Sequence, residues 1–465
     1  MQGRGYLSKK NPVFRDYYQV RDWLEGFVPE TYTKKELGLG RIEYLLKLLG
    51  NPQEKFKSIH IAGTSGKGSM AYYTARLLAE NFKFQISNFK LKKIGLHISP
   101  HLVYIGERMQ INNKPIKVIE LIKLINRIKP VVESMRGLRV GLPSYFEILV
   151  AASFLYFAQE KVDWAVVEVG LGGRLDATNV LNPQIVVITN VGLDHTDILG
   201  KSIEKIAFEK AGIIKPATCV ITGANGKALE VIRKVSKQKK AQLITKSTLS
   251  RAFGKKSEVN KYRKLYKRLF DNSSPFVTEE TFLLSCATVA SLGISLNEAK
   301  IIEAFKCPFA GRFEEIDKGV IVDGAHNLEK IKVLVNFLKK SKVKSQKSKV
   351  ILVIAFKKGK DWQGMIDYLF RNLDIERCIT TQFYSVTDTG FFASVEPEEI
   401  AKYVKSKWKV PPKGRAGAVE SFDNSQEAVF HSLNSKLYST NSLILITGSL
   451  YLVGEVRTLW YLPKF

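Results

Sequence analysis

The chain has 465 residues, of which 45% are hydrophobic and 25% charged, an ordinary globular composition that at this length predicts two domains. No apolar run reaches the roughly 18 residues of a membrane helix. The N-terminus also lacks the apolar segment of a signal peptide, so we expect a cytoplasmic protein without a membrane partner. The net charge of +28 would suit a nucleic acid, but lysines are spread over most polar segments and no nucleic-acid-binding motif is present, which favours a basic surface that attracts small polyanionic substrates.

Strands alternate with helices along the whole chain, which predicts an α/β fold with a mainly parallel sheet. In the first half the expected strands are 58–62, 94–102, 164–169, 184–190 and 218–222, and the expected helices 70–80, 118–135, 144–159, 202–211, 281–292 and 297–305. The charged segment 246–280 is expected to form loops or irregular strands. In the second half we expect strands 320–323, 350–355, 377–381 and 443–447, a helix 328–339 and a lysine-rich surface loop at 339–349.

The segment from Ser58 to Ala75 combines a short apolar strand, a glycine-rich turn and a helix. In that order the backbone N–H groups of the turn and the positive end of the helix dipole converge on one point, which suits a phosphate group. Lys67 adds a positive charge and the hydroxyl of Ser69 can hold Mg²⁺. The turn departs from the standard P-loop because Gly68 separates these two residues. We expect phosphate binding here, with a generic glycine-serine loop as the alternative.

Glu168 ends a predicted buried strand and is followed by the glycine-rich segment GLGG. A carboxylate in this place, opposite a phosphate loop, is where a nucleotide-bound Mg²⁺ needs an anionic ligand. The alternative is a structural glutamate at the end of a strand. The chain also contains four cysteines, which are far apart and never form a CxxC pair, so neither a zinc site nor a disulfide framework is expected.

His195 and Lys210, fifteen residues apart, end a predicted strand and a predicted helix. They could frame a second cation only if the lysine loses its charge, because an ammonium group would repel Mg²⁺. A lysine that pairs with the neighbouring Glu204 or Glu209 is the alternative. Five of the six histidines lie in or beside turns at strand ends, where α/β proteins bind their ligands, although a structural role stays open for each: His60, His97, His101, His195 and His326.

A series of motifs in a fixed order resembles the folylpolyglutamate synthase and dihydrofolate synthase family of the Mur ligase superfamily. The motifs are LGLGRI, GTSGKGS, ISPHL, ERMQIN, SYFE, VEVGLGGRLDATN, ITNVGLDHTDILG, FEKAGII, GRFE, VDGAHN and ITGSLYLVGEVR, and they extend over about residues 37–457. The resemblance implies a P-loop domain followed by a smaller Rossmann-like domain. We place the boundary after Cys307, which gives domains 1–307 and 308–465.

The resemblance implies an ATP-dependent ligase that adds L-glutamate to the carboxylate of a folate or of dihydropteroate through an acyl phosphate. It also implies ATP and two Mg²⁺ ions in the site, and we expect a monomer. Two alternatives are a related Mur-type ligase with another acceptor and a basic P-loop protein associated with nucleic acid. In the second case the lysine-rich segment 339–349 would contact the phosphate backbone.

Individual residues take roles from the resemblance. The implied ATP-binding residues are Gly63, Thr64, Ser65, Gly66, Lys67, Gly68, Ser69, Arg312 and Asp323. The implied Mg²⁺ ligands are Ser69, Ser99, Glu168, His195 and Lys210, the last as a carbamate. The implied contacts to the pteroyl substrate are Ser144, Leu175, Asp176 and Ala177, and the implied catalytic residues are Lys67, Lys210 and His326.

Three positions depart from the family pattern. Ser285 stands roughly where relatives carry an asparagine that contacts ATP, and Ser65 stands where asparagine is common. The segment 246–280 lacks the usual apolar-proline-apolar-glycine run. The first and third departures bear on how the adenine is held and leave the phosphate chemistry unchanged.

Overall fold

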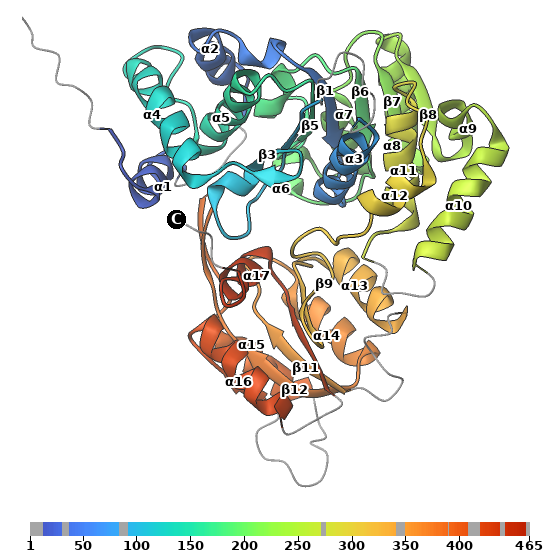
Figure 1. The fold of residues 1–465 in the computed structure, drawn as a ribbon. Coiled ribbons are helices and arrows are strands. Elements are labelled where there is room, and N and C mark those ends of the chain that lie inside the picture. The colour runs from blue at the N-terminus through green and yellow to red at the C-terminus, as the bar shows by residue number, and fades with distance from the viewer. Residues whose placement is uncertain are drawn as a thin grey trace, which may run out of the picture.

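The computed structural model describes residues 13–29, 37–82, 92–270, 276–340, 349–388, 390–407, 419–437 and 442–461. Its strands form an eight-stranded sheet, a six-stranded sheet and a separate two-stranded hairpin. We call the described residues from 13 to 304, which contain the larger sheet, the N-terminal unit, and those from 314 to 461 the C-terminal unit. Figure 1 shows the two units one above the other, blue to yellow in the first and orange to red in the second.

The larger sheet confirms the expected α/β fold. Its strands are β1 (Lys57–Ala62), β2 (Ile94–His97), β3 (Met109–Ile111), β4 (Lys114–Pro115), β5 (Trp164–Glu168), β6 (Ile185–Ile188), β7 (Cys219–Thr222) and β8 (Gln242–Thr245), in the spatial order β4-β3-β2-β5-β1-β6-β7-β8. The run from β2 to β8 in this order is parallel, whereas β3 and β4 add an antiparallel edge. The phosphate-loop strand β1 therefore lies in the middle of the sheet.

The central strands are buried on both faces, so they appear in the sequence as continuous apolar runs. Alternate residues face different cores: Val166 of β5 belongs to the cluster that contains Leu77 and Phe282, and Val167 to the cluster that contains Ile148 and Phe154. The helices of this unit are α1 (Tyr17–Glu25), α2 (Gly40–Leu48), α3 (Lys67–Phe82), α4 (Val118–Ser134), α5 (Tyr145–Gln159), α6 (Thr196–Leu199), α7 (Ile203–Ala211), α8 (Gly226–Gln238), α9 (Ser250–Phe253), α10 (Lys256–Phe270), α11 (Glu279–Ala290) and α12 (Glu298–Ala304).

The expectation of loops or irregular strands at 246–280 was wrong. Most of this segment is helical, in α9 and α10. The buried side chains of α10 recur at helical spacing, at Val259, Tyr262, Leu265 and Phe270, and pack into the core beside α11. The many lysines and arginines between these positions hid that period. Residues 271–275 lie outside the described residues.

The C-terminal unit has a six-stranded sheet in the order β15-β12-β11-β16-β10-β9. Its strands are β9 (Glu314–Asp317), β10 (Val320–Asp323), β11 (Lys349–Ile354), β12 (Ile375–Thr380), β15 (Val419–Ser421) and β16 (Ser442–Thr447), and its helices α13 (Leu328–Lys340), α14 (Trp362–Asn372), α15 (Pro397–Lys407), α16 (Ser425–Leu437) and α17 (Leu450–Arg457). Only β9 pairs antiparallel. The hairpin consists of β13 (Tyr384–Thr387) and β14 (Gly390–Ala393). Most of the lysine-rich loop, residues 341–348, lies outside the described residues.

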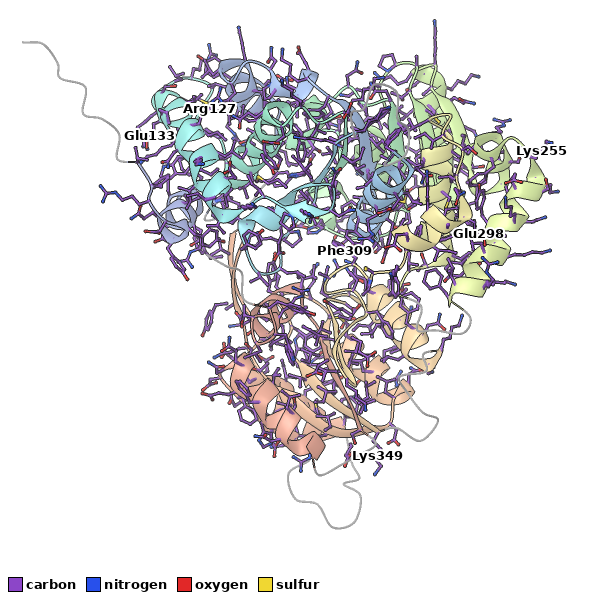
Figure 2. All side chains as sticks on the ribbon, in the orientation of Figure 1. Arg127, Glu133, Lys255, Glu298, Phe309 and Lys349 are labelled. Carbon is purple, nitrogen blue, oxygen red and sulfur yellow. The ribbon has the colours of Figure 1, made fainter. Side chains whose placement is uncertain are left out.

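The two units are connected between Ala304, where α12 ends, and Glu314, where β9 begins. The expected domain boundary at 307/308 falls in this connection and stays a prediction. Phe309 of the connection lies between the units (Figure 2), where its ring stacks on that of Tyr72 with centroids 4.7 Å apart. Among the described helices, none combines the length and the apolar character that a membrane span requires.

Candidate functional site

A pocket of about 890 Å³ lies between the two units. Its walls include the carboxyl ends of β1, β5 and β6 and that of β10, the usual place for ligands of parallel sheets. Every residue to which the sequence analysis gave a binding or catalytic role lines this pocket: Gly63, Thr64, Ser65, Gly66, Lys67, Gly68, Ser69, Ser99, Ser144, Glu168, Leu175, Asp176, Ala177, His195, Lys210, Arg312, Asp323 and His326. The structure therefore brings the predicted site residues together, although it does not test their roles.

The glycine-rich turn joins β1 to α3 and is hydrogen-bonded to residues at the end of β6. Thr189 donates its Oγ1 hydrogen to the carbonyl of Ser65 at 2.7 Å, and the Oδ1 atom of Asn190 accepts from the N–H of Ser65 at 2.9 Å. A Cβ atom on Gly63 would lie 1.9 Å from Thr189 Oγ1, so only glycine allows this close contact. Because α3 begins at Lys67, the turn presents the first N–H groups of a helix to the pocket.

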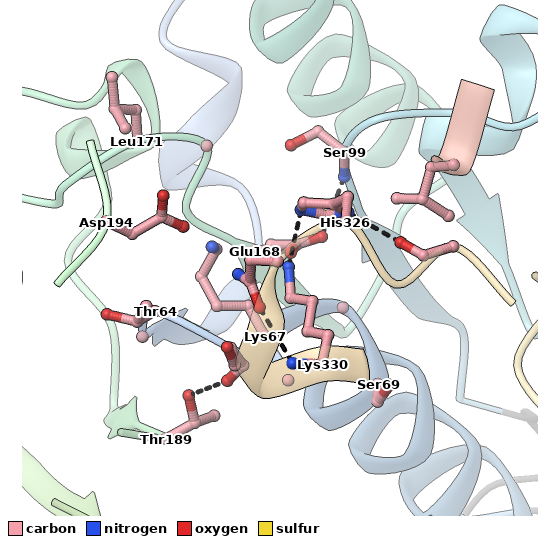
Figure 3. A pocket seen from close by; sticks show the side chains of 18 of the residues that line it. Thr64, Lys67, Ser69, Ser99, Glu168, Leu171, Thr189, Asp194, His326 and Lys330 are labelled. Carbon is pink, nitrogen blue, oxygen red and sulfur yellow. Dashed lines mark hydrogen bonds between the residues drawn. The ribbon is translucent and has the colours of Figure 1, made fainter. Parts of the chain in front are cut away.

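Glu168 lies beside this turn at the end of β5 and is 5% exposed. Its Oε2 atom accepts from the backbone N–H of Ser99 at 3.0 Å, and a Cβ atom on Gly68 would lie 3.4 Å from the same oxygen. Burial raises the pKa of Glu168, and the charge of Lys67 opposes that rise. Figure 3 shows Glu168, Lys67, Ser69 and Ser99 around one space.

This donor set fits a metal ion that arrives with a nucleotide. Within the described ranges, no group of three or more histidine, cysteine, aspartate or glutamate side chains is arranged to hold a metal ion. One buried carboxylate with the nearby hydroxyls of Ser69 and Ser99 is nevertheless typical of Mg²⁺, which is commonly held by one or two carboxylates together with phosphate oxygens. The site of Glu168 therefore suits magnesium with a phosphate ligand and would be incomplete without one.

Lys210 lies in the last turn of α7 and is 4% exposed. Its Nζ atom donates to the carbonyl of Gly63 at 2.9 Å, so its side chain reaches the phosphate loop. Burial, with a further contribution from the charge of Lys67, lowers the pKa of Lys210 to about 7. The alternative partners are engaged elsewhere, since Glu204 pairs with Lys227 and Glu209 with Arg174.

His195 lies directly before α6 with a left-handed backbone at φ 49°. Its side chain is half exposed, and its Nε2 atom is 3.9 Å from Oδ1 of Asp194. Burial lowers the pKa of His195 to about 4 despite that carboxylate, so the imidazole is neutral at pH 7 and can act as a ligand. His195 and Lys210 line the same pocket on the side of β6 and α7.

The residues expected at the pteroyl end lie in two turns. Ser144 caps α5 in a capping box with Glu147, whose carboxylate also pairs with Arg41 at 2.9 Å. Asp176 accepts from the N–H groups of Leu171 and Thr178 at 2.8 and 3.0 Å, so its carboxylate folds the glycine-rich segment back on itself. Beside these turns the pocket wall is apolar, which suits a flat ring system: Leu37, Pro100, Phe146, Leu171, Leu175 and Leu199.

Asp323 and His326 form the wall contributed by the C-terminal unit, together with Arg312. Asp323, at the end of β10, accepts from the N–H groups of Phe313 and Ala325 at 2.8 Å each, and burial raises its pKa. Burial lowers the pKa of Arg312, whereas the charges of Asp323 and Glu168 raise it. Asp323 therefore shapes the turn that holds His326 and also stabilises the guanidinium group.

The remaining histidines near strand ends have structural contacts outside the pocket. His60 is 2.8 Å from Thr178 Oγ1, His97 is 2.8 Å from Ser153 Oγ, and His101 accepts from Arg108 at 2.9 Å. Ser285 is also buried, with its hydroxyl 3.3 Å from the sulfur of Met70. Ser285 does not line the pocket, so the expected link between this position and the adenine stays a prediction.

Several pocket residues were missed by the sequence analysis. Lys330 lies four residues after His326 and donates to it at 2.8 Å, and Lys360 pairs with Asp194 of the N-terminal unit at 3.4 Å. A second pair between the units joins Arg108, which is fully buried, to Asp388 beside the β13–β14 hairpin, at 2.8 Å. Only Lys330 had a signal in the sequence, namely its place one helical turn beyond the VDGAHN motif.

Two family models match the two units separately. Residues 61–281 match the Mur ligase middle domain, and residues 312–459 match the C-terminal domain of dihydrofolate synthetase. The chain is 30% identical to the dihydrofolate synthase/folylpolyglutamate synthase of Bacillus subtilis, over 96% of this chain and 99% of that protein. It is also 30% identical to the dihydrofolate synthetase of Saccharomyces cerevisiae, over 90% of this chain and 97% of that protein.

A solved structure agrees with these sequence matches. The folylpolyglutamate synthase of Mycobacterium tuberculosis, complexed with ADP, superposes with a TM-score of 0.78 at 27% identity and covers 96% of this chain and 99% of that one. The matches therefore extend over both units and over the pocket between them. This chain belongs to the folylpolyglutamate synthase/dihydrofolate synthase family.

Proposed function

We propose that this chain is an ATP-dependent ligase that joins L-glutamate to the carboxylate of a folate-type substrate. One observation carries this proposal: a phosphate loop beside a buried carboxylate opens into the same pocket as an apolar wall and a cationic wall from the second unit. Such a pocket can hold a nucleotide, a flat ring and an anionic tail together. The names of its relatives, dihydrofolate synthase and folylpolyglutamate synthase, support the same reaction.

The chemistry follows from the weakness of a carboxylate as an electrophile. In the first step a carboxylate oxygen of the substrate attacks the γ-phosphorus of ATP, ADP leaves, and an acyl phosphate forms. Lys67 and Arg312 would stabilise the charge on the transferring group, and the N–H groups of the phosphate loop would orient the phosphates. In the second step the amine of glutamate attacks the acyl carbon, phosphate leaves, and the amine loses a proton.

Magnesium would be held by Glu168, Ser69 and Ser99, and when bound it neutralises phosphate charge. The wall made by Arg312, Asp323 and His326 would keep water away from the acyl phosphate, which hydrolyses readily.

We also propose that Lys210 carries a carbamate and, with His195, forms a second magnesium site. The pKa of Lys210 is lowered to about 7, so a large fraction of its amine is neutral near that pH. A neutral amine adds CO₂ and releases one proton, which gives an anion in place of a cation. The carbamate nitrogen keeps one N–H, so the bond from Lys210 to Gly63 need not be lost.

The deciding experiment measures ADP formation with L-glutamate, comparing dihydropteroate and tetrahydrofolate as acceptors. We expect ADP formation to require ATP, glutamate and at least one of the two acceptors, and the product to gain the mass of one glutamyl residue. A rate of ATP turnover that does not depend on either acceptor would favour a Mur-type ligase with another acceptor. Salt-sensitive binding of RNA without glutamate-dependent turnover would contradict the proposal.

A further inference from the structure

Lys330 lies in the first turn of α13, one helical turn after His326, and its side chain lines the pocket. Its Nζ atom is 2.8 Å from Nε2 of His326. Figure 3 shows this contact beside Lys67 and Glu168. Lys332 on the same helix contrasts with it, because Lys332 is exposed and pairs with Glu329 at 2.7 Å.

The direction of the bond between Lys330 and His326 follows from the other imidazole nitrogen. Nδ1 of His326 is 2.7 Å from the carbonyl oxygen of Gly324, which can only accept, so Nδ1 carries the proton. Burial lowers the pKa of His326, which leaves the ring neutral and Nε2 without a proton. Nε2 therefore accepts, and Lys330 donates one of its three N–H groups. His326 fixes where the ammonium group lies.

Lys330 belongs to a group of charged residues in which cations outnumber carboxylates by one. Arg312, Lys67 and Lys360 lower the pKa of Lys330 and Asp194 raises it, and Lys330 in turn lowers the pKa values of Glu168 and Asp323. Among the described residues, no carboxylate oxygen lies within 4.0 Å of Lys330 Nζ, the distance that defines an ion pair. Burial and these cations lower the pKa of Lys330 to about 7. Such a group of cations is stabilised by an anionic ligand with several charges.

We propose that Lys330 is a further phosphate-binding residue, which contacts the terminal phosphoryl group of the nucleotide from the C-terminal unit. This inference rests on the proposed function, since it requires a nucleotide in the pocket. A bound triphosphate favours the charged state of Lys330, and the two N–H groups that His326 does not use are donated to phosphoryl oxygens. Lys67 and Lys330 then hold the transferring group from the two units, and His326 acts as the positioning residue of Lys330.

The test compares a diphosphate with a triphosphate. Dissociation constants for ADP and for a non-hydrolysable ATP analogue, each with excess Mg²⁺, are measured by calorimetry on the full chain for the unchanged protein, Lys330→Met, Lys330→Arg and the matched control Lys332→Met. In Lys330→Met we expect triphosphate affinity to fall on the order of tenfold to a hundredfold while ADP affinity changes less than about twofold. Lys330→Arg keeps the charge and should recover part of the affinity, and Lys332→Met should match the unchanged protein.

Each other outcome contradicts the inference in a recognisable way. Equal weakening of ADP and the triphosphate would make Lys330 a structural residue of the pocket, and unchanged affinity for both would remove it from the site. If the unchanged protein bound neither nucleotide, the proposed function itself would fail. Lys330→Gln, which is one atom shorter but keeps an N–H donor without the charge, replaces Lys330→Met if the melting curve of the latter shows unfolding, and the same comparison then decides.

Discussion

Two strand–turn–helix segments face the pocket, and they present it with different chemistry. In β1 to α3 the backbone forms the surface, because Gly63 packs directly on Thr189 and the first N–H groups of α3 point outward. In β10 to α13 the N–H of Ala325 donates to Asp323 and that of Gly324 to the carbonyl of Gly311, so the side chains of His326 and Lys330 form the surface instead. A site formed by the backbone is therefore visible in the sequence as glycines, whereas a site formed by side chains depends on residues brought together by folding.

The largest effect is expected from Lys67→Ala, which removes the one charge inside the backbone site. Turnover should fall on the order of a hundredfold or more, because stabilisation of the transferring group is lost. Steady-state assays of kcat measure this, and Lys57→Ala at the exposed start of β1 is the control. Near-normal turnover in Lys67→Ala would show that the glycine-rich turn does not serve phosphate transfer.

Lys210→Ala tests whether activity also requires the Lys210 side chain beside the phosphate loop. We expect nearly complete loss of activity, with partial recovery when short carboxylates are added, because these can replace the carbamate. Isotopically labelled CO₂ should give a carbamate signal in the NMR spectrum of the unchanged protein that is missing in the variant. A variant that turns over normally, or an unchanged protein without that signal, would exclude the modified lysine.

Glu168→Gln should have a smaller effect that depends on magnesium. The amide keeps an oxygen for the N–H of Ser99 but loses the negative charge, so the variant should need more Mg²⁺ for half-maximal activity. A magnesium titration of turnover shows this as a shift of the midpoint, with ADP affinity in the absence of metal as the reference. If the midpoint is unchanged while kcat falls, Glu168 acts in the chemistry and not in holding the ion.

The smallest effect is expected from Gly63→Ala. The new Cβ atom would force Thr189 Oγ1 away and break its bond to Ser65, at a net cost of about 0.5–1.5 kcal/mol, or up to roughly tenfold in nucleotide affinity. The backbone of Gly63 at φ 155° would strain alanine in addition. The control is Gly40→Ala, where a Cβ atom would meet nothing within 4 Å. Partial recovery of affinity in the double variant with Thr189→Ala would confirm the clash with Oγ1, because the Cβ atom of residue 189 and the strained backbone of residue 63 remain. An affinity loss that Thr189→Ala does not change would point to another cause.

Features could be predicted from the sequence where the residues that define them are close together in the chain. The phosphate loop, Glu168 and the central strands were predictable because strand, turn and helix are adjacent in the chain. The helix α10 was missed because its buried residues are separated by lysines and arginines. The expected roles of Asp176 and Ser144 stay predictions, although the structure shows that both also cap or fold local turns.

Contacts between the two units could not be predicted at all. Arg108 and Asp388 are 280 positions apart, and no pattern in the sequence around either residue indicates the other as its partner. The same is true of Lys360 and Asp194. The family resemblance supplied the site residues of the second unit, but it did not supply Lys330, whose position is set by the bond to His326.

The buried pair of Arg108 and Asp388 has a consequence for the rate at which the enzyme releases product. If the C-terminal unit moves away when product leaves, the guanidinium of Arg108 must exchange a carboxylate at 2.8 Å for water. Removing one partner from a buried pair is costly until water enters, so this exchange slows the opening step. Opening, and not bond formation, would then limit turnover. Asp388→Asn should therefore release ADP faster in stopped-flow experiments, and more of the acyl phosphate should be lost to hydrolysis.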